Sequence, residues 1–169
     1  MMSLLMTSAP LAMVMCNHSV GEAALGIQWH TIGMYAPSFF TGALILRFGL
    51  RGMMTTGLVL IAAAAAIGYV GIGLWNFWLS LVVLGIGWNF AFIGATTLVT
   101  ECHGPEERNK VQAVNDFLTF GSMAVASLSS GALLARYGWT MVTELVFPVV
   151  IAAAVLLAWG TFTHRTEPA

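Results

Sequence analysis

Charged residues are scarce in this sequence. Of its 169 residues only 8% are Asp, Glu, Lys or Arg, against 59% that are hydrophobic, and the mean hydropathy is +0.87. A soluble domain carries roughly 25% charged residues, so this composition excludes a water-exposed globular surface. The few charges also leave gaps of 21, 24 and 49 residues, at positions 1–21, 23–46 and 52–100. Because a helix needs about 20 apolar residues to cross the hydrocarbon core, the sequence predicts an integral membrane protein.

Other features are missing too, and each absence excludes a class of function. Lys and Arg total 6 against 7 Asp and Glu, so there is no basic surplus for binding nucleic acid. No segment follows the phosphate-binding pattern G-x-x-x-x-G-K-[ST], and the two cysteines, Cys16 and Cys102, lack the spacing of metal ligands. No apolar stretch pairs a nucleophile with a base. We therefore expect no enzyme, no metal and no other cofactor.

The long apolar runs predict that helices, rather than strands, cross the membrane. The 49-residue run would form a helix of about 74 Å, more than twice the roughly 30 Å core, so it must fold back. Breaks at polar, Gly and Pro clusters divide the chain into six transmembrane helices, which makes the predicted fold all-α and polytopic. The predicted spans are residues 3–16, 25–46, 53–70, 77–99, 111–135 and 139–162.

The distribution of Arg and Lys predicts the orientation. Six spans place both termini and two of the connecting loops on one side, which holds five of the six basic residues, whereas the other side holds Arg136. The positive-inside rule then makes the first side cytoplasmic. We therefore expect both termini in the cytoplasm.

Polar side chains at membrane depth mark candidate sites, because each costs free energy unless it faces a partner or a cavity. The second predicted helix carries Gln28 and His30, and the fourth carries Trp88, Asn89 and Phe92. An amide beside aromatic rings is typical of a small-molecule pocket, but Asn also joins helices, and both interpretations stay open. His30 either couples a proton or bonds to a neighbouring helix.

A second polar pattern follows the fifth predicted helix. Its residues recur at steps of three or four: Gln112, Asp116, Thr119, Met123, Ser127 and Ser130. Lipid is a poor neighbour for such a face, so we expect it to look into protein or water. Asp116 is either a gating or proton-coupling carboxylate or an acid near the interface that the helix dipole stabilises.

The loop after the second predicted helix resembles the signature G-x-L-x-D-R-x-G-R-R of the major facilitator superfamily. The matching residues are Gly42, Leu44, Arg47, Gly49 and Arg51, with Leu46 where the signature has Asp. The segment from Glu101 to Arg108 and the stretches at 28–42 and 115–121 also resemble bacterial permeases of this superfamily.

The resemblance implies that the six helices correspond to helices seven to twelve of a twelve-helix permease, which form one half-bundle. It implies a secondary transporter of the bacterial inner membrane that moves a small solute with an ion gradient, a proton being the candidate ion. The other implied partners are the lipid bilayer and a second six-helix bundle. The implied cytoplasmic charge latch comprises Arg47, Arg51, Glu101, Arg108 and Asp116, although Leu46 leaves it without one acid.

Three interpretations of the whole chain remain open. It is a fragment or truncated form of a transporter, a half-transporter that works as a homodimer, or a non-transporting membrane scaffold whose polar stripes only pack helices together. An amide, an indole and an imidazole suit many solutes, so the sequence specifies no substrate.

Overall fold

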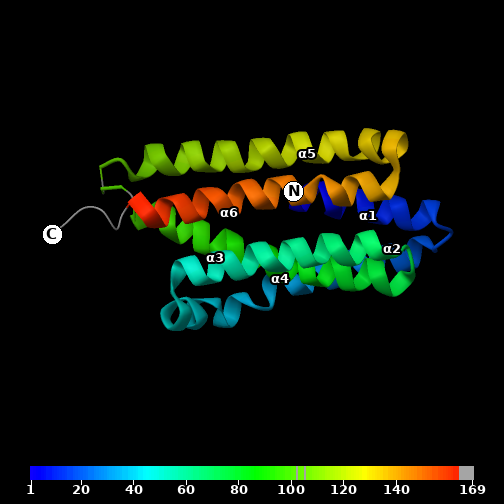
Figure 1. Cartoon of the computed structure of the whole chain (residues 1–169), viewed down its shortest axis with the longest axis horizontal. Coiled ribbons are helices and arrows are strands. Elements are labelled where there is room, and N and C mark those ends of the chain that lie inside the picture. The colour runs from blue at the N-terminus through cyan, green and yellow to red at the C-terminus, as the bar shows by residue number, and fades with distance from the viewer. Residues whose placement is uncertain (102, 105, 164–169) are drawn as a thin grey trace.

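Helices form the framework of the described chain. The computed structural model describes residues 1–101, 103–104 and 106–163, with side chains at all of these except 101 and 161–163. In these ranges the secondary structure consists of helices, without strands (Figure 1). The helices are α1 (Met2–Met15), α2 (Val20–Tyr35), α3 (Ser38–Val70), α4 (Leu74–Glu101), α5 (Arg108–Glu144) and α6 (Val146–Thr163). The prediction of an all-α fold is confirmed.

Two of the helices are interrupted at a glycine with positive φ. Gly49 in α3 has φ 77° and ψ 158°, and Gly138 in α5 has φ 78° and ψ 178°. Residues with a side chain rarely adopt these values, so glycine suits both positions. Figure 1 shows the chain reversing at each of them, so that residues 38–48 run opposite to 50–70, and residues 108–137 run opposite to α6.

Three helical segments of the described chain are long and apolar enough to cross a membrane. They are Ser38–Val70, Leu74–Thr100 and Arg108–Gly160, while the apolar α1 is shorter. The first and third contain the reversals at Gly49 and Gly138, so neither runs straight. The count of six spans therefore stays a prediction.

The predicted helix 25–46 is divided between two helices. α2 ends at Tyr35 and α3 begins at Ser38, with a turn between them. Pro37 lies in this turn, and it lacks the N–H that an unbroken helix would need there. The interruption brings the main-chain oxygen of Met34 within reach of a side chain from α4, which donates to it at 2.8 Å.

α2 begins with a capping box at the end of the connection from α1. The main-chain N–H of Ser19 donates to Oε2 of Glu22 at 2.7 Å, and the N–H of Glu22 donates to Oγ of Ser19 at 3.2 Å. The backbone bond from Ser19, followed by that from its hydroxyl, lowers the pKa of the Glu22 carboxyl from its ordinary value of 4.5, since both favour the ionised form. A short polar sequence thus fixes where this helix starts.

α4 lies against both α2 and α3 in the bundle. The buried side chains on α3 and α4 include Ile61, Ala64, Phe77, Leu81 and Leu84. Glycines bring the backbones close: a Cβ built at Gly57 would lie 2.5 Å from the nitrogen of Ala91 and 2.7 Å from the oxygen of Gly87. Close approach at small residues is the usual packing of membrane helices, and it fixes where the α4 side chains described below project.

Candidate functional site

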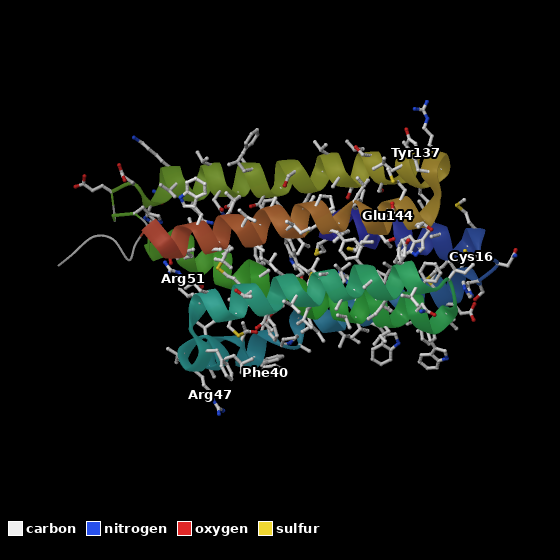
Figure 2. The ribbon with its side chains drawn as sticks, viewed as in Figure 1. Cys16, Phe40, Arg47, Arg51, Tyr137 and Glu144 are labelled. Atoms are coloured by element: carbon white, nitrogen blue, oxygen red, sulfur yellow. The ribbon has the colours of Figure 1, made fainter. Side chains whose placement is uncertain are left out.

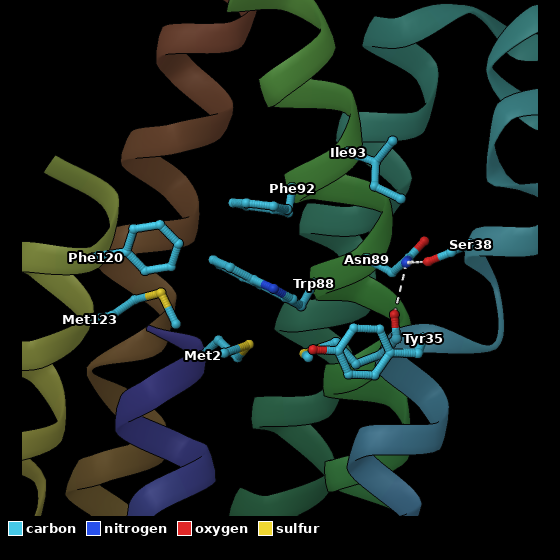
Figure 3. Close-up of a pocket in the computed structure, with 10 residues that line it drawn as sticks. Met2, Tyr35, Ser38, Trp88, Asn89, Phe92, Ile93, Phe120 and Met123 are labelled. Atoms are coloured by element: carbon cyan, nitrogen blue, oxygen red, sulfur yellow. Dashed lines mark hydrogen bonds between the residues drawn. The ribbon is translucent and has the colours of Figure 1, made fainter. Parts of the chain in front are cut away.

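A pocket of about 390 Å³ lies where α1, the α2–α3 turn, α4 and α5 meet (Figure 3). Its lining residues are Met2, Met34, Tyr35, Ser38, Trp88, Asn89, Phe92, Ile93, Phe120 and Met123. Most of these side chains are apolar or aromatic, with a few polar groups among them. This volume and this lining are those of a small-molecule site.

Trp88 and Phe92 form a stacked pair in the pocket wall. They lie one turn apart on α4, with ring centroids 5.1 Å apart and ring planes 20° apart, and Figure 3 shows both rings projecting from that helix in the same direction. The same pair lines a second hollow of about 330 Å³, whose wall includes Ser3 and Thr119. The hydroxyl of Ser3 is buried and has no hydrogen-bond partner among the described residues. Two adjoining hollows therefore share one aromatic wall.

Asn89 lines the pocket, but its amide is already bonded within the protein. The residue is 4% exposed, and Nδ2 donates to the main-chain oxygen of Met34 at 2.8 Å and to Oγ of Ser38 at 2.6 Å (Figure 3). The hydroxyl of Thr41 donates to its Oδ1 at 2.7 Å. These three bonds join α4 to the α2–α3 turn, and they occupy both polar ends of the amide.

Gln28 and His30 are not among the residues that line the pocket. Gln28 is exposed on α2, whereas His30 is 1% exposed. Nδ1 of His30 lies 2.8 Å from the main-chain oxygen of Leu81, and its Nε2 is buried without a hydrogen-bond partner in the described part of the chain. The structure thus shows Nδ1 of His30 bonded to a neighbouring helix, and Nε2 is the ring atom that a coupling proton would occupy.

Two of the candidate latch residues lie at the end of the bundle where α3 reverses. Figure 2 shows Arg47 and Arg51 there, on either side of Gly49 in the sequence. The guanidinium of Arg47 lies 5.4 Å from the centre of the Phe48 ring. A terminal nitrogen of Arg51 donates to the main-chain oxygen of Gly160 at 3.4 Å, so this residue contacts α6.

The other latch candidates belong to α4 and α5. Asp116 accepts hydrogen bonds from Nε2 of Gln112 at 2.9 Å and from Nδ2 of Asn115 at 3.4 Å. Arg108 is exposed, and the side chain of Glu101 lies outside the described part of the structure. Asp116 is therefore held by neutral amides of its own helix, and the charge latch stays a prediction.

The polar face of α5 packs against α1 at Ser127 and Ser130. The hydroxyls of Thr7 and Ser127 lie 3.3 Å apart, and the hydroxyl of Ser8 donates to the main-chain oxygen of Ser130 at 3.4 Å. Ser8 and Ser130 are fully buried. The expectation that this face looks into protein or water is confirmed there, since these residues contact α1.

The family to which the chain belongs follows from comparison with known proteins. The family model described as Major Facilitator Superfamily matches residues 1–169. The chain belongs to this superfamily. It is therefore an integral membrane protein from a family of transporters, not an enzyme.

Several superfamily members resemble the chain along most of its length. The riboflavin transporter RfnT of Brucella anthropi is 54% identical over 157 residues, which are 93% of this chain and 39% of the relative. The MFS-type transporter YddS of Bacillus subtilis is 35% identical, over 89% of this chain and 36% of the relative. The multidrug resistance protein MdtH of Cronobacter sakazakii is 27% identical, over 89% and 38%. The chain thus spans 36–39% of the length of these relatives, and no solved structure matches it significantly.

Three pocket residues of this superfamily member were not predicted from sequence patterns: Tyr35, Ser38 and Phe120. Tyr35 and Ser38 flank the helix interruption at Pro37, so that proline was the available signal. Phe120 directly follows Thr119 of the polar α5 face and so lies at its edge. Nothing in the sequence indicated that these three residues line one pocket with Trp88, because they belong to separate helices.

Proposed function

We propose that this chain forms the carboxyl-terminal half-bundle of a major facilitator permease, and that the complete transporter moves a flat, ring-containing solute such as riboflavin. The stacked Trp88–Phe92 pair, exposed to two adjoining hollows, is the observation that carries the proposal. Aromatic side chains favour offset stacking on other ring systems, so this wall suits a planar solute. The 54% identity to a protein named as a riboflavin transporter supports the same class of substrate.

The polar atoms around the rings support a solute with hydrogen-bonding edges. Because the Asn89 amide is occupied by Met34, Ser38 and Thr41, it holds the pocket in shape and does not take the solute. The hydroxyl of Ser3 is buried in the second hollow without a partner among the described residues, so a polar edge of the solute would satisfy it. The ring system would then lie on Trp88 and Phe92.

The proposed topology has six membrane crossings, with the reversals at Gly49 and Gly138 as the turns between crossings. The crossings would be the predicted spans, residues 3–16, 25–46, 53–70, 77–99, 111–135 and 139–162. The distribution of basic residues supports a cytoplasmic Gly49 end of the bundle, in the inner membrane of a bacterium. Transport by two rocking bundles further requires a second six-helix bundle against this one.

Proton coupling and a charge latch complete the proposed mechanism. Arg47 and Arg108 are exposed and so are available to pair with acids of a second bundle, while Asp116 and His30 are the groups proposed to bind the coupling proton. Uptake that keeps its dependence on a proton gradient in both Asp116→Asn and His30→Ala would refute this coupling.

Riboflavin binding to the purified chain in detergent tests the substrate class, with flavin fluorescence as the readout. Stacking on indole quenches flavin emission, so we expect saturable quenching. Trp88→Ala should weaken the affinity by about tenfold or more, since one aromatic stack contributes roughly 1–3 kcal/mol. Trp75→Ala is the matched control, because Trp75 is an exposed tryptophan at the start of α4 that packs on Trp78 and does not line the pocket.

Two results would contradict the proposal. Equal loss of affinity in Trp88→Ala and Trp75→Ala would mean that the quenching does not come from the pocket. Saturable binding of a sugar, together with no saturable binding of riboflavin or of any other aromatic solute, would exclude an aromatic substrate.

A further inference from the structure

A second groove, separate from the pocket, lies between residues 50–70 of α3 and α6. Its volume is about 420 Å³, and it shares no lining residue with the Trp88–Phe92 pocket. Its lining residues are Arg51, Thr55, Leu58, Val59, Ala62, Val150, Ala154, Leu157 and Ala158. The proposed function makes no use of this groove.

Small apolar side chains create the hollow. Ala62, Ala154 and Ala158 occupy less space than the branched residues around them, so the two helices leave a channel between them. The α3 residues recur at steps of three or four from position 51 to position 62, so the groove follows the helix axis for roughly 16 Å. Val59 in its wall is 61% exposed, which shows that the groove is open to the surroundings of the bundle. In a bilayer those surroundings are acyl chains.

Arg51 gives the groove a charge at one end. It is the one charged residue among the described groove-lining residues, and Figure 2 shows it at the end of the bundle, beside the end of α6. Its bond to the oxygen of Gly160 is long, at 3.4 Å, and engages one of the five guanidinium N–H donors. The planar fork of a guanidinium matches the oxygens of a phosphate, which it binds through charge-assisted bonds.

We propose that this groove binds one acyl chain of an anionic phospholipid, whose phosphate pairs with Arg51. Charge complementarity selects this ligand, because a single cation ends an apolar channel at the level where lipid headgroups lie. A zwitterionic headgroup carries an ammonium group that the guanidinium repels, and free phosphate has no chain to fill the channel. The bound lipid contacts both α3 and α6 and so stabilises their packing.

Native mass spectrometry of the detergent-solubilised chain tests the site. Phosphatidylglycerol and phosphatidylcholine with the same acyl chains are titrated separately, and inorganic phosphate is added as a competitor. We expect one phosphatidylglycerol to bind more tightly than phosphatidylcholine, without competition from phosphate. Arg51→Gln should weaken phosphatidylglycerol binding by about tenfold, which corresponds to losing a charge-assisted bond. Ala154→Phe, which fills the channel and keeps the charge, should weaken binding of both lipids.

Arg47→Gln is the matched control, because Arg47 is an exposed arginine at the same end of the bundle that does not line the groove. Its affinity for phosphatidylglycerol should equal that of the unchanged chain, and equal helix content by circular dichroism confirms that each variant folds. Equal losses in Arg51→Gln and Arg47→Gln would overturn the proposal, since they would indicate a general effect of charge. Equal affinity for the two lipids, or unchanged binding in a folded Ala154→Phe variant, would overturn it as well.

Discussion

Asn89 shows how one buried side chain can join the walls of a pocket. Its amide bonds to Met34, Ser38 and Thr41, on either side of the turn that Pro37 imposes. An interrupted helix in a membrane exposes main-chain oxygens that need partners, and neighbouring helices supply them. Here the partner is an α4 amide that is 4% exposed, so the turn and the aromatic wall on α4 are held at a fixed separation.

Asn89→Ala should therefore destabilise the bundle. The substitution leaves the part-buried oxygen of Met34 without this donor, which costs about 1–3 kcal/mol. SDS titration in mixed micelles, followed by circular dichroism, measures the free energy of unfolding. Gln28→Ala is the control: it removes an exposed amide from α2 and should change that free energy by less than about 0.5 kcal/mol. Equal effects of the two substitutions would contradict a holding role for Asn89.

The roles of single residues were only partly predictable from the sequence. Asn89 and Trp88 stood out because an amide and an indole sit inside an apolar run. Whether the amide faced a solute or another helix depended on Met34, Ser38 and Thr41, whose contacts with it exist only after α4 packs against the α2–α3 turn. His30 was ambiguous for the same reason, since its partner is a main-chain oxygen on α4.

At the scale of helices, glycines fix how closely α4 approaches its neighbours. A Cβ built at Gly85 would collide with the main-chain oxygen of His30 and lie 2.9 Å from the nitrogen of Met34. Gly85→Ala should therefore push α2 and α4 apart and lower the free energy of unfolding by about 1–3 kcal/mol. Gly121→Ala is the matched control in α5, because nothing lies within 4 Å of a Cβ there and Ala favours a helix over Gly. Destabilisation by Gly121→Ala as large as that by Gly85→Ala would show that close packing is not the cause.

The start of α2 should depend on pH through Glu22. Its pKa is lowered from 4.5 in the folded chain, so the capping bond contributes its full stability above pH 4.5 and loses it as the pH falls through the lower, folded value. We expect hydrogen-exchange protection of the first α2 amides, corrected for intrinsic rates, to fall in that acidic range. Glu22→Gln keeps an acceptor for the cap but does not titrate there, so its protection should stay constant. A parallel loss in both proteins would assign the effect to another group.

Helix starts and turns were easier to read from sequence than helix continuity. The polar connection before α2 and the glycine-rich segment at 47–52 are visible in the sequence, and the chain turns at both places. The predicted helix 25–46 ran through Pro37 without a break, because proline is tolerated in membrane helices where neighbouring side chains satisfy the freed backbone. Its effect depends on Asn89, a residue of another helix.

At the scale of the whole molecule, large apolar side chains remain exposed on residues 38–48 and on α5. On residues 38–48 they include Phe39 at 94% and Leu46 at 90%, and on α5 they include Phe117 at 77% and Leu128 at 84%. Lipid or a second bundle would cover these surfaces equally well by hydrophobicity alone. A transport assay distinguishes these two possibilities, since transport by rocking bundles requires a second bundle beside the first.

We therefore expect a single copy of this bundle to bind solute without carrying it. Riboflavin uptake is measured in proteoliposomes that contain, on average, from well below one to several copies of the chain per vesicle. If two copies must pair, only vesicles that hold at least two copies are active. The fraction of active vesicles is then negligible at low loading and rises with the square of the mean copy number. If a dissimilar half is required, no loading gives saturable uptake, although flavin quenching persists. Trp88→Ala vesicles correct for leak, and saturable uptake that rises linearly from below one copy per vesicle would refute the need for a second bundle.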